Sequence, residues 1–231
     1  MRFFLLGLLV LLQACASVSN PDPRDPWESL NRNVYGVNDA LDRSVLKPVA
    51  IVYRDGIPYW IRKGVSNFFG NLSDVWSIVN NAITLQGRAT GASLGRVLVN
   101  STVGVLGVMD VATDLNLEKY PADFGVTLGR WGVNPGPYVV VPLLGPYTLR
   151  EVVALPLDRK GNLVNQIGDE NLRTGLTVLN YVDDRAVYLK VTDVMEGAAL
   201  DPYSFTRDAY LQRQRYRQFN GSPPEEIDVK P

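Results

Sequence analysis

The stretch VSNFFGNLSDVWSIVNNAITL, residues 65–85, decides the fold of this chain of 231 residues. Its opposite sides differ in polarity, because apolar side chains recur there at helical spacing: Val65, Phe68, Phe69, Leu72, Val75, Trp76, Val79 and Ile83. The other face carries serine and asparagine, with Asp74 as its only charge, whereas a helix in water usually shows several Lys and Glu residues there. The stretch therefore predicts an amphipathic helix whose polar face is almost neutral.

Two interpretations of this neutral polar face are open. The face packs against other parts of the protein, or the helix lies at a lipid boundary while its uncharged polar side borders a wet interior. Six side chains of this helix are accordingly candidates for a lipid path or a membrane-facing helix: Phe68, Phe69, Asn71, Leu72, Trp76 and Asn80.

Other segments of the chain also have helical patterns. Asp25-Pro26-Trp27-Glu28 predicts a helix with Asp25 at its N-cap and Pro26 at its first position, and Asp201-Pro202 predicts a similar start for a helix that runs to about Phe219. Further helical segments are predicted over residues 88–111, 162–181 and 183–198. The predicted fold class is therefore mainly α.

A stretch rich in glycine and proline follows Trp131, and it carries no charge between Trp131 and Thr148. The density of these residues excludes long regular structure. Apolar side chains and an irregular backbone both need cover from water, so we expect this loop to be buried or to line a cavity. Trp131 is a candidate for the lipid path, and so is Arg173, the one cation between Asn171 and Tyr181, although a solvated arginine is the alternative.

The last predicted helix is cationic in its second half, with Asp208 as the single acidic residue near Arg207, Arg213, Arg215 and Arg217. Cations near a helix C-terminus interact favourably with the helix dipole, so a solvated capping role is one interpretation. Contact with anionic lipid headgroups or with an acidic partner is the other.

The chain begins with a positive residue, Arg2, an apolar run from Phe3 to Leu12, and Leu-Gln-Ala before its only cysteine, Cys15. This order predicts a secretory signal over residues 1–14 that is too short to span a bilayer. A cysteine at the boundary resembles a bacterial lipoprotein signal, which implies acylation of Cys15 on its sulfur and amine, and Ala16 implies export to the outer membrane. An ordinary signal peptide followed by an unmodified thiol is the alternative. Residues 16–24 suit a flexible leash to a helical domain over 25–219, and the polar tail over 220–231 is expected to be disordered.

Composition excludes several classes of function. The chain has no histidine, which removes the commonest general base, the commonest zinc ligand and the usual catalytic triad. Its net charge of −1 argues against nucleic-acid binding by broad phosphate neutralisation. Gly91-Ala92-Ser93-Leu94-Gly95 matches a hydrolase nucleophile motif, but its surroundings are predicted to be helical and no histidine exists to activate Ser93. We therefore expect no enzyme activity, no metal and no cofactor.

Eight blocks of residues occur in the same order as in the MlaA/VacJ lipoproteins, and the chain resembles that family over nearly all of its mature part. The blocks are Asp25-Pro26-Trp27-Glu28-x-x-Asn31-Arg32, Leu46 to Ala50, Val65 to Leu72, Asn100 to Gly104, Asp123 to Gly129, Trp131 to Tyr138, Leu143 to Arg150 and Asp201-Pro202-Tyr203.

The resemblance implies a ring of amphipathic helices that lies in the inner leaflet of the outer membrane around an amphipathic channel. It implies removal of mislocalised phospholipids from the outer leaflet, which preserves lipid asymmetry. The implied partners are a trimeric porin and the soluble periplasmic carrier MlaC, and the transported ligand is phospholipid. A structural envelope lipoprotein that scaffolds other outer-membrane proteins is the alternative function.

Overall fold

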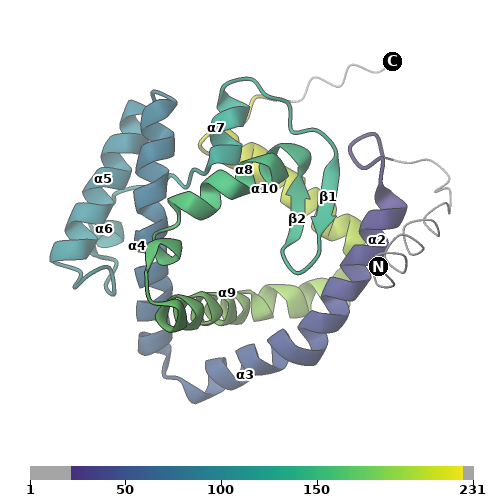
Figure 1. Ribbon diagram of the computed structural model, residues 1–231, viewed down its shortest axis with the longest axis horizontal. Helices are drawn as coiled ribbons and strands as arrows, with labels where there is room; N and C mark the ends of the chain where they lie inside the picture. Colours follow the sequence, from purple (N-terminus) through teal and green to yellow (C-terminus); the bar gives the residue numbers. More distant parts are fainter. Residues whose placement is uncertain (1–21, 226–231) are drawn as a thin grey trace.

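The computed structural model describes residues 22–225, and the fold is mainly helical, as predicted (Figure 1). The first half of the chain forms α2 (Glu28–Leu41), the π-helical turn η1 (Asp42–Leu46), α3 (Lys47–Gly56), α4 (Tyr59–Ile83), α5 (Gly87–Thr102) and α6 (Val111–Asp114). The second half forms α7 (Phe124–Arg130), β1 (Tyr138–Val141), β2 (Gly145–Thr148), α8 (Leu149–Gly161), the 3-10 turn η2 (Leu163–Gln166), α9 (Glu170–Ala198) and α10 (Pro202–Gln218).

The elements surround a central opening in Figure 1. α2 and α3 form one side of the outline, α4 forms another, and α9 runs between them. α8, α10 and the β1–β2 hairpin lie on the side of the opening that faces α9. α5 and α6 lie outside this frame; α5 packs against α4, and α6 packs against α5.

The start of the first helix differs from its prediction. α2 begins at Glu28, and Asp25 is not its N-cap but a fully buried carboxylate in the preceding turn. Asp25 accepts hydrogen bonds from Asn31 and Tyr203, and Arg207 lies 3.5 Å from it. Because two of these partners come from α10, near the other end of the chain, the carboxylate joins the two ends of the domain rather than capping a helix.

α4 covers the predicted helix up to Ile83, extends it at the N-terminus, and buries its polar face more fully than its apolar one. Asn71, Asp74, Ser77, Asn80 and Asn81 are buried, whereas Val79 and Ile83 are exposed. Asp74 forms an ion pair with Arg96 of α5 at 3.3 Å, and Thr127 of α7 donates to Asn80 at 2.8 Å. Of the two interpretations of the neutral face, the structure supports packing against protein.

Buried polar side chains and exposed apolar side chains are found in most of the described elements, as in α4. The buried apolar clusters are small: one joins Ala50 of α3 to Ala186 and Leu189 of α9, and the other joins Tyr138 and Val140 of β1 to Tyr203 of α10. Buried polar and charged side chains are at least as prominent, and large apolar side chains are exposed on every long helix. Exposed apolar surface on this scale indicates contact with an apolar environment or with partners.

The segment rich in glycine and proline contains a short antiparallel hairpin, which the sequence did not predict. β1 and β2 pair Tyr138 with Thr148 and Val141 with Gly145. The free edge of β1 is held by α2, because Asn31 bonds both the carbonyl of Tyr138 and the amide of Val140, and Asn38 bonds the carbonyl of Val141. The residues between Trp131 and Tyr138 remain irregular.

Two predicted boundaries are wrong. The helices expected over 162–181 and 183–198 are a 3-10 turn followed by one helix of 29 residues, α9. The helix expected over 88–111 ends at Thr102, because Val105, Leu106 and Gly107 have positive φ and turn the chain before α6. Over the described part of the chain, no helix is both long and apolar enough to cross a membrane.

Candidate functional site

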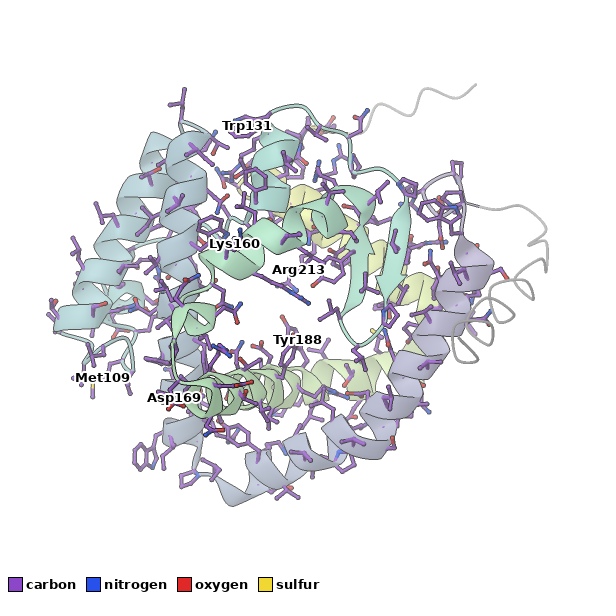
Figure 2. All side chains as sticks on the ribbon, in the orientation of Figure 1. Met109, Trp131, Lys160, Asp169, Tyr188 and Arg213 are labelled. Atoms are coloured by element: carbon purple, nitrogen blue, oxygen red, sulfur yellow. The ribbon has the colours of Figure 1, made fainter. Side chains whose placement is uncertain are left out.

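A cavity of about 890 Å³ lies inside the frame of helices, and it is the candidate functional site. Its walls come from α2 and η1, the hairpin, α8, α9 and α10, so it forms only when the ends of the domain are brought together. Figure 2 shows Tyr188 of α9 and Arg213 of α10 pointing into the central opening from opposite sides. Its volume lies within the range of ordinary ligand pockets.

The cavity wall combines apolar and polar surface. The hairpin supplies Val140 and Leu144, and α9 supplies Val191 and Met195. Carboxylates and guanidinium groups line the same space, so apolar and charged groups face one ligand. Such a wall suits an amphipathic molecule better than a purely polar or purely apolar one.

Most charges in the cavity wall are paired with each other. Arg185 of α9 bonds Asp42 at 2.7 Å, Arg217 of α10 bonds Asp123 at 2.6 Å, and Arg43 bonds Asp39 at 3.1 Å. The first two of these ion pairs join different elements, α9 to η1 and α10 to the segment before α7.

Asp184 of α9 and Arg213 of α10, both in the described part of the chain, line the cavity, and no ion pair joins them. Enclosure by protein atoms raises the pKa of Asp184, the charge of Asp183 raises it further, and Arg213 lowers it. Asp184 is nevertheless reached by water from the cavity, so both charges are available to a ligand.

A second cavity of about 580 Å³ adjoins the first, and the two share Leu144, Tyr147, Leu155 and Asp158. Its other residues come from the end of α8, η2 and α9, and they include Arg159 and Lys160. The shared Asp158 accepts hydrogen bonds from the indole of Trp76 and the amide of Phe124, while burial raises its pKa. The two cavities therefore adjoin along the four shared residues, and both have cations in their walls.

The candidate residues from α4 lie outside this central space. Asn80 bonds Thr127 and Asn71 donates to Ser101, so both hold helices together. Trp76 does not line the cavity, but its indole donates a hydrogen bond to Asp158, which does. Leu72 is half-buried. Phe68 and Phe69 line a separate apolar groove of about 260 Å³ between α4, Val108 and α9.

Trp131 and Arg173 also lie away from the cavity. Trp131 is exposed at the outer edge of the molecule, and its ring meets that of Phe124 edge to face (Figure 2). Arg173 donates to the carbonyl of Ile167 at 3.0 Å, which caps the turn η2. Contact of these residues with lipid stays a prediction.

The cationic half of α10 has three different roles in the structure. Arg207 is buried among Asp22, Asp25, Glu28 and Asp208. Arg217 bonds Asp123, and Arg215 donates to the carbonyl of Pro224. Arg213 points into the opening and Arg217 also lines the cavity, so neither a solvated cap nor a single lipid-facing patch describes the whole set.

The remaining predictions concern the lipid anchor, a hydrolase nucleophile and a metal site. Cys15, residues 1–14 and most of the leash fall outside the described residues. Ser93 is buried in the middle of α5, so the strand-turn-helix setting of a hydrolase nucleophile is not present around it. Within residues 22–225 no cluster of His, Cys, Asp and Glu could hold a metal ion.

Few of the residues that line the cavity could be expected from the sequence; among the arginines of the last helix, Arg213 and Arg217 line it. Asp42, Tyr188 and Leu144, for example, come from three elements that are far apart in sequence. The uncharged apolar stretch after Trp131 was the one useful signal, since Val140, Leu144, Gly145 and Pro146 do line the space.

The fold and the cavity define a class of protein: a helical frame with a polar interior, an apolar exterior and an internal amphipathic space. Comparisons identify the family. The sequence model of the MlaA lipoprotein family matches residues 23–217, and the chain belongs to this family.

Individual relatives agree with this assignment. The chain is 32% identical to the intermembrane phospholipid transport system lipoprotein MlaA of Escherichia coli, over 91% of this chain and 85% of that protein. It is also 32% identical to an uncharacterised protein of Rickettsia typhi, over 83% of this chain and 76% of that protein. A solved structure concerned with the maintenance of bacterial outer membrane lipid asymmetry superimposes with a TM-score of 0.74 at 32% identity, covering 84% of this chain and 98% of that one.

Proposed function

We propose that this chain is an outer-membrane lipoprotein that removes phospholipids from the outer leaflet and so maintains lipid asymmetry. The observation that carries the proposal is the amphipathic central cavity inside a body whose outer surface is apolar. Membership of the MlaA family supports it, because relatives in that family are named for intermembrane phospholipid transport.

The exposed apolar side chains support a position of the body in one leaflet. They occur along α3, α4, α5, α8 and α9, and no helix in the described part of the chain is long and apolar enough to span a bilayer. A helix that lies in the leaflet buries its apolar side in acyl chains and leaves its polar side to the protein interior. An acylated Cys15 would hold this body in the periplasmic leaflet.

The cavity offers a path for a lipid headgroup. A charged group that crosses hydrocarbon unaided meets a large desolvation cost. Charged and polar side chains of the cavity wall replace the headgroup's hydration, and the apolar hairpin and α9 side chains accommodate the acyl chains. Arg213 and Asp184 offer one charge of each sign, which suits a phosphate and an amine of a zwitterionic headgroup.

Two partners complete the proposed pathway. A soluble carrier of the MlaC type would receive the phospholipid on the periplasmic side. A trimeric porin would hold the ring in the outer membrane against its exposed apolar surface. Both partners come from the family resemblance rather than from a contact in this chain.

The proposal is tested in a bacterial strain that lacks its own copy of the gene. Outer-leaflet phospholipid is measured after return of the native chain, Arg213→Glu or the control Arg88→Glu, whose side chain is exposed and distant from the cavity. We expect Arg213→Glu to leave outer-leaflet phospholipid raised, and the native chain and the control to restore it. Equal restoration by all three at equal protein level would contradict transport through the cavity and favour a scaffolding lipoprotein.

A further inference from the structure

Two arginines lie close together where the ends of α4, α7 and α10 meet, and both bond only neutral groups. Arg130 donates to the side chains of Asn81, Thr84 and Asn220 and to the carbonyl of Gln218. Arg150 donates to the carbonyl of Val133 and the side-chain oxygen of Gln218. Gln218 therefore lies between the two guanidinium groups.

No carboxylate in the described part of the chain forms an ion pair with either arginine. The nearest carboxylates are occupied, since Asp123 pairs with Arg217 and Glu151 accepts from Thr148 and Tyr210. Burial lowers the pKa of Arg130 and that of Arg150. The charge of Asp123 partly opposes this at Arg130, and the charges of Glu151 and Asp123 partly oppose it at Arg150. Arg150 is 7% exposed, and its Nε is buried with no hydrogen-bond partner. Buried charges are normally paired, so this site lacks an anion.

A pocket of about 460 Å³ opens beside these groups, lined by Gln86, Gly129, Arg130, Gln218, Phe219 and Asn220. No acidic residue lines it, and its wall is mostly polar. Gly129 leaves room for these side chains, because a Cβ at this position would lie 2.6 Å from a guanidinium nitrogen of Arg150 and 2.6 Å from the side-chain oxygen of Gln218. The pocket shares no residue with the central cavity.

The surroundings of this pocket are apolar and exposed. Phe219 is exposed and lines the pocket. Leu85 and Trp131 are also exposed, and they are the sequence neighbours of the pocket residues Gln86 and Arg130. Figure 2 places Trp131 at the outer edge of the molecule, away from the opening into which Arg213 points. An anionic group with an apolar tail would therefore match both the pocket and its rim.

We propose that this pocket binds a phosphate group, either as inorganic phosphate or as the phosphate of a lipid headgroup. Guanidinium groups bind phosphate through charge-assisted hydrogen bonds, and Arg130 supplies one in the pocket wall, with Arg150 behind Gly129. The amide side chains of Gln86 and Asn220 add neutral donors. The site goes beyond the proposed function, because it lies outside the path through the central cavity.

The experiment measures anion binding and the unfolding midpoint of the full chain in non-ionic detergent. The probes are inorganic phosphate and dihexanoyl phosphatidylglycerol below its micellar concentration, at constant ionic strength. Arg130→Gln removes the charge at the pocket. Gln86→Glu keeps the size of that side chain and supplies an internal carboxylate. Arg88→Gln is the control, since its exposed side chain pairs with Glu118 away from the pocket.

At least one probe is expected to raise the midpoint of the native chain and of the control. Arg130→Gln and Gln86→Glu should each weaken its binding by about tenfold or more. Binding of inorganic phosphate assigns the site to the free anion, and binding of the lipid alone assigns it to a headgroup.

No gain in midpoint with either probe, or equal binding by Gln86→Glu and the native chain, would overturn the proposal. If Arg130→Gln does not fold, Gln86→Glu decides. Because no lipid transfer is measured, failure of the proposed transport would not change the result.

Discussion

At the scale of single residues, the most constrained contact is the buried ion pair between α4 and α5. The side chains of Asp74 and Arg96 are 3% and 4% exposed. Burial raises the pKa of Asp74, while Lys119 and Arg96 oppose that rise. Arg96 also bonds Asp110, Thr113 and the carbonyl of Leu117, so one guanidinium fixes the turn that follows α5.

Arg96→Leu is therefore expected to be severely destabilising. It leaves the carboxylate of Asp74 buried with only Lys119 nearby, which costs about 3–5 kcal/mol in the free energy of unfolding. Chemical denaturation in detergent checks this, with Arg88→Leu as the exposed control. The double variant Asp74→Asn/Arg96→Leu should recover part of the loss, and a double variant less stable than Arg96→Leu would refute the assignment.

Asp110 predicts a pH dependence of stability. Burial raises its pKa, but hydrogen bonds from Thr113, Asn100 and Arg96 outweigh this and lower the pKa to about 2. A carboxylate with a lowered folded-state pKa stabilises the protein above its unfolded value near 3.8 and loses that contribution as the pH falls toward 2. We expect Asp110→Asn to be less stable than the native chain at neutral pH and to lose less stability between pH 4 and pH 2. Parallel pH curves for the two chains would contradict this.

Single residues also show where local sequence signals fail. Asp25-Pro26 has the composition of a helix start, yet Asp25 is drawn into a buried cluster with Tyr203 and Arg207 from α10. Asp201-Pro202 has the same composition and does start a helix, with Asp201 accepting from the amide of Tyr203. The difference lies in partners nearly the whole chain away, which no local pattern contains.

At the scale of elements, α2 acts as the neighbour that β1 otherwise lacks. A two-stranded hairpin is marginal in water by itself. Asn31 and Asn38 lie two turns apart on α2 and bond the backbone of β1 and of the turn after it. The hairpin wall of the cavity is thus attached to a helix rather than left as a free loop.

Asn31→Ala is expected to cost about 2–4 kcal/mol, because it leaves the carbonyl of Tyr138 and the amide of Val140 without partners in a buried place. Asn38→Ala should cost less, since its site is partly exposed. Hydrogen exchange of the Val140 amide measures the local effect and denaturation the global one. Equal protection of that amide in both variants would show that α2 does not hold the hairpin.

The contact between α4 and the end of α8 depends on a glycine. A Cβ at Gly161 would lie 2.2 Å from the ring of Trp76, whereas one at Gly175 in α9 would meet nothing within 4 Å. Gly161→Ala should displace Trp76 from Asp158 and lower the unfolding midpoint. Gly175→Ala should be neutral or stabilising by up to about 1 kcal/mol. A midpoint for Gly161→Ala equal to that of Gly175→Ala would contradict the close contact.

Helices could be predicted from the sequence better than their limits or their orientation. The period of α4 is clear in residues 65–85, but the period alone does not say which face is buried. In water the apolar face would be inside, and here the asparagine face is. The break expected near Val182 is absent because Val182, Asp183 and Ala186 all lie on the buried side of α9, so the helix continues.

At the scale of the whole molecule, polarity is arranged inside out around an amphipathic space. Polar contacts such as Asn80 with Thr127 hold the helices together, while apolar side chains such as Val79 and Val187 face outward. The almost neutral face of α4 was the sequence signal for this arrangement. The cavity itself could not be predicted, because Asp42, Leu144 and Arg213 meet only through the closed frame of helices.

The most direct test of the account asks whether phospholipid passes through this space. Tyr188 points into the opening, and Cys15 is the only cysteine of the chain and its expected lipid anchor. Tyr188→Cys therefore permits a thiol reagent to fill the cavity, with Leu98→Cys on the exposed side of α5 as the matched control. The measured quantity is transfer of labelled phospholipid from isolated outer membranes to a soluble carrier. We predict that transfer falls as the reagent on Tyr188→Cys becomes larger and is unchanged for Leu98→Cys; undiminished transfer with the largest reagent fully attached at residue 188 would contradict the account.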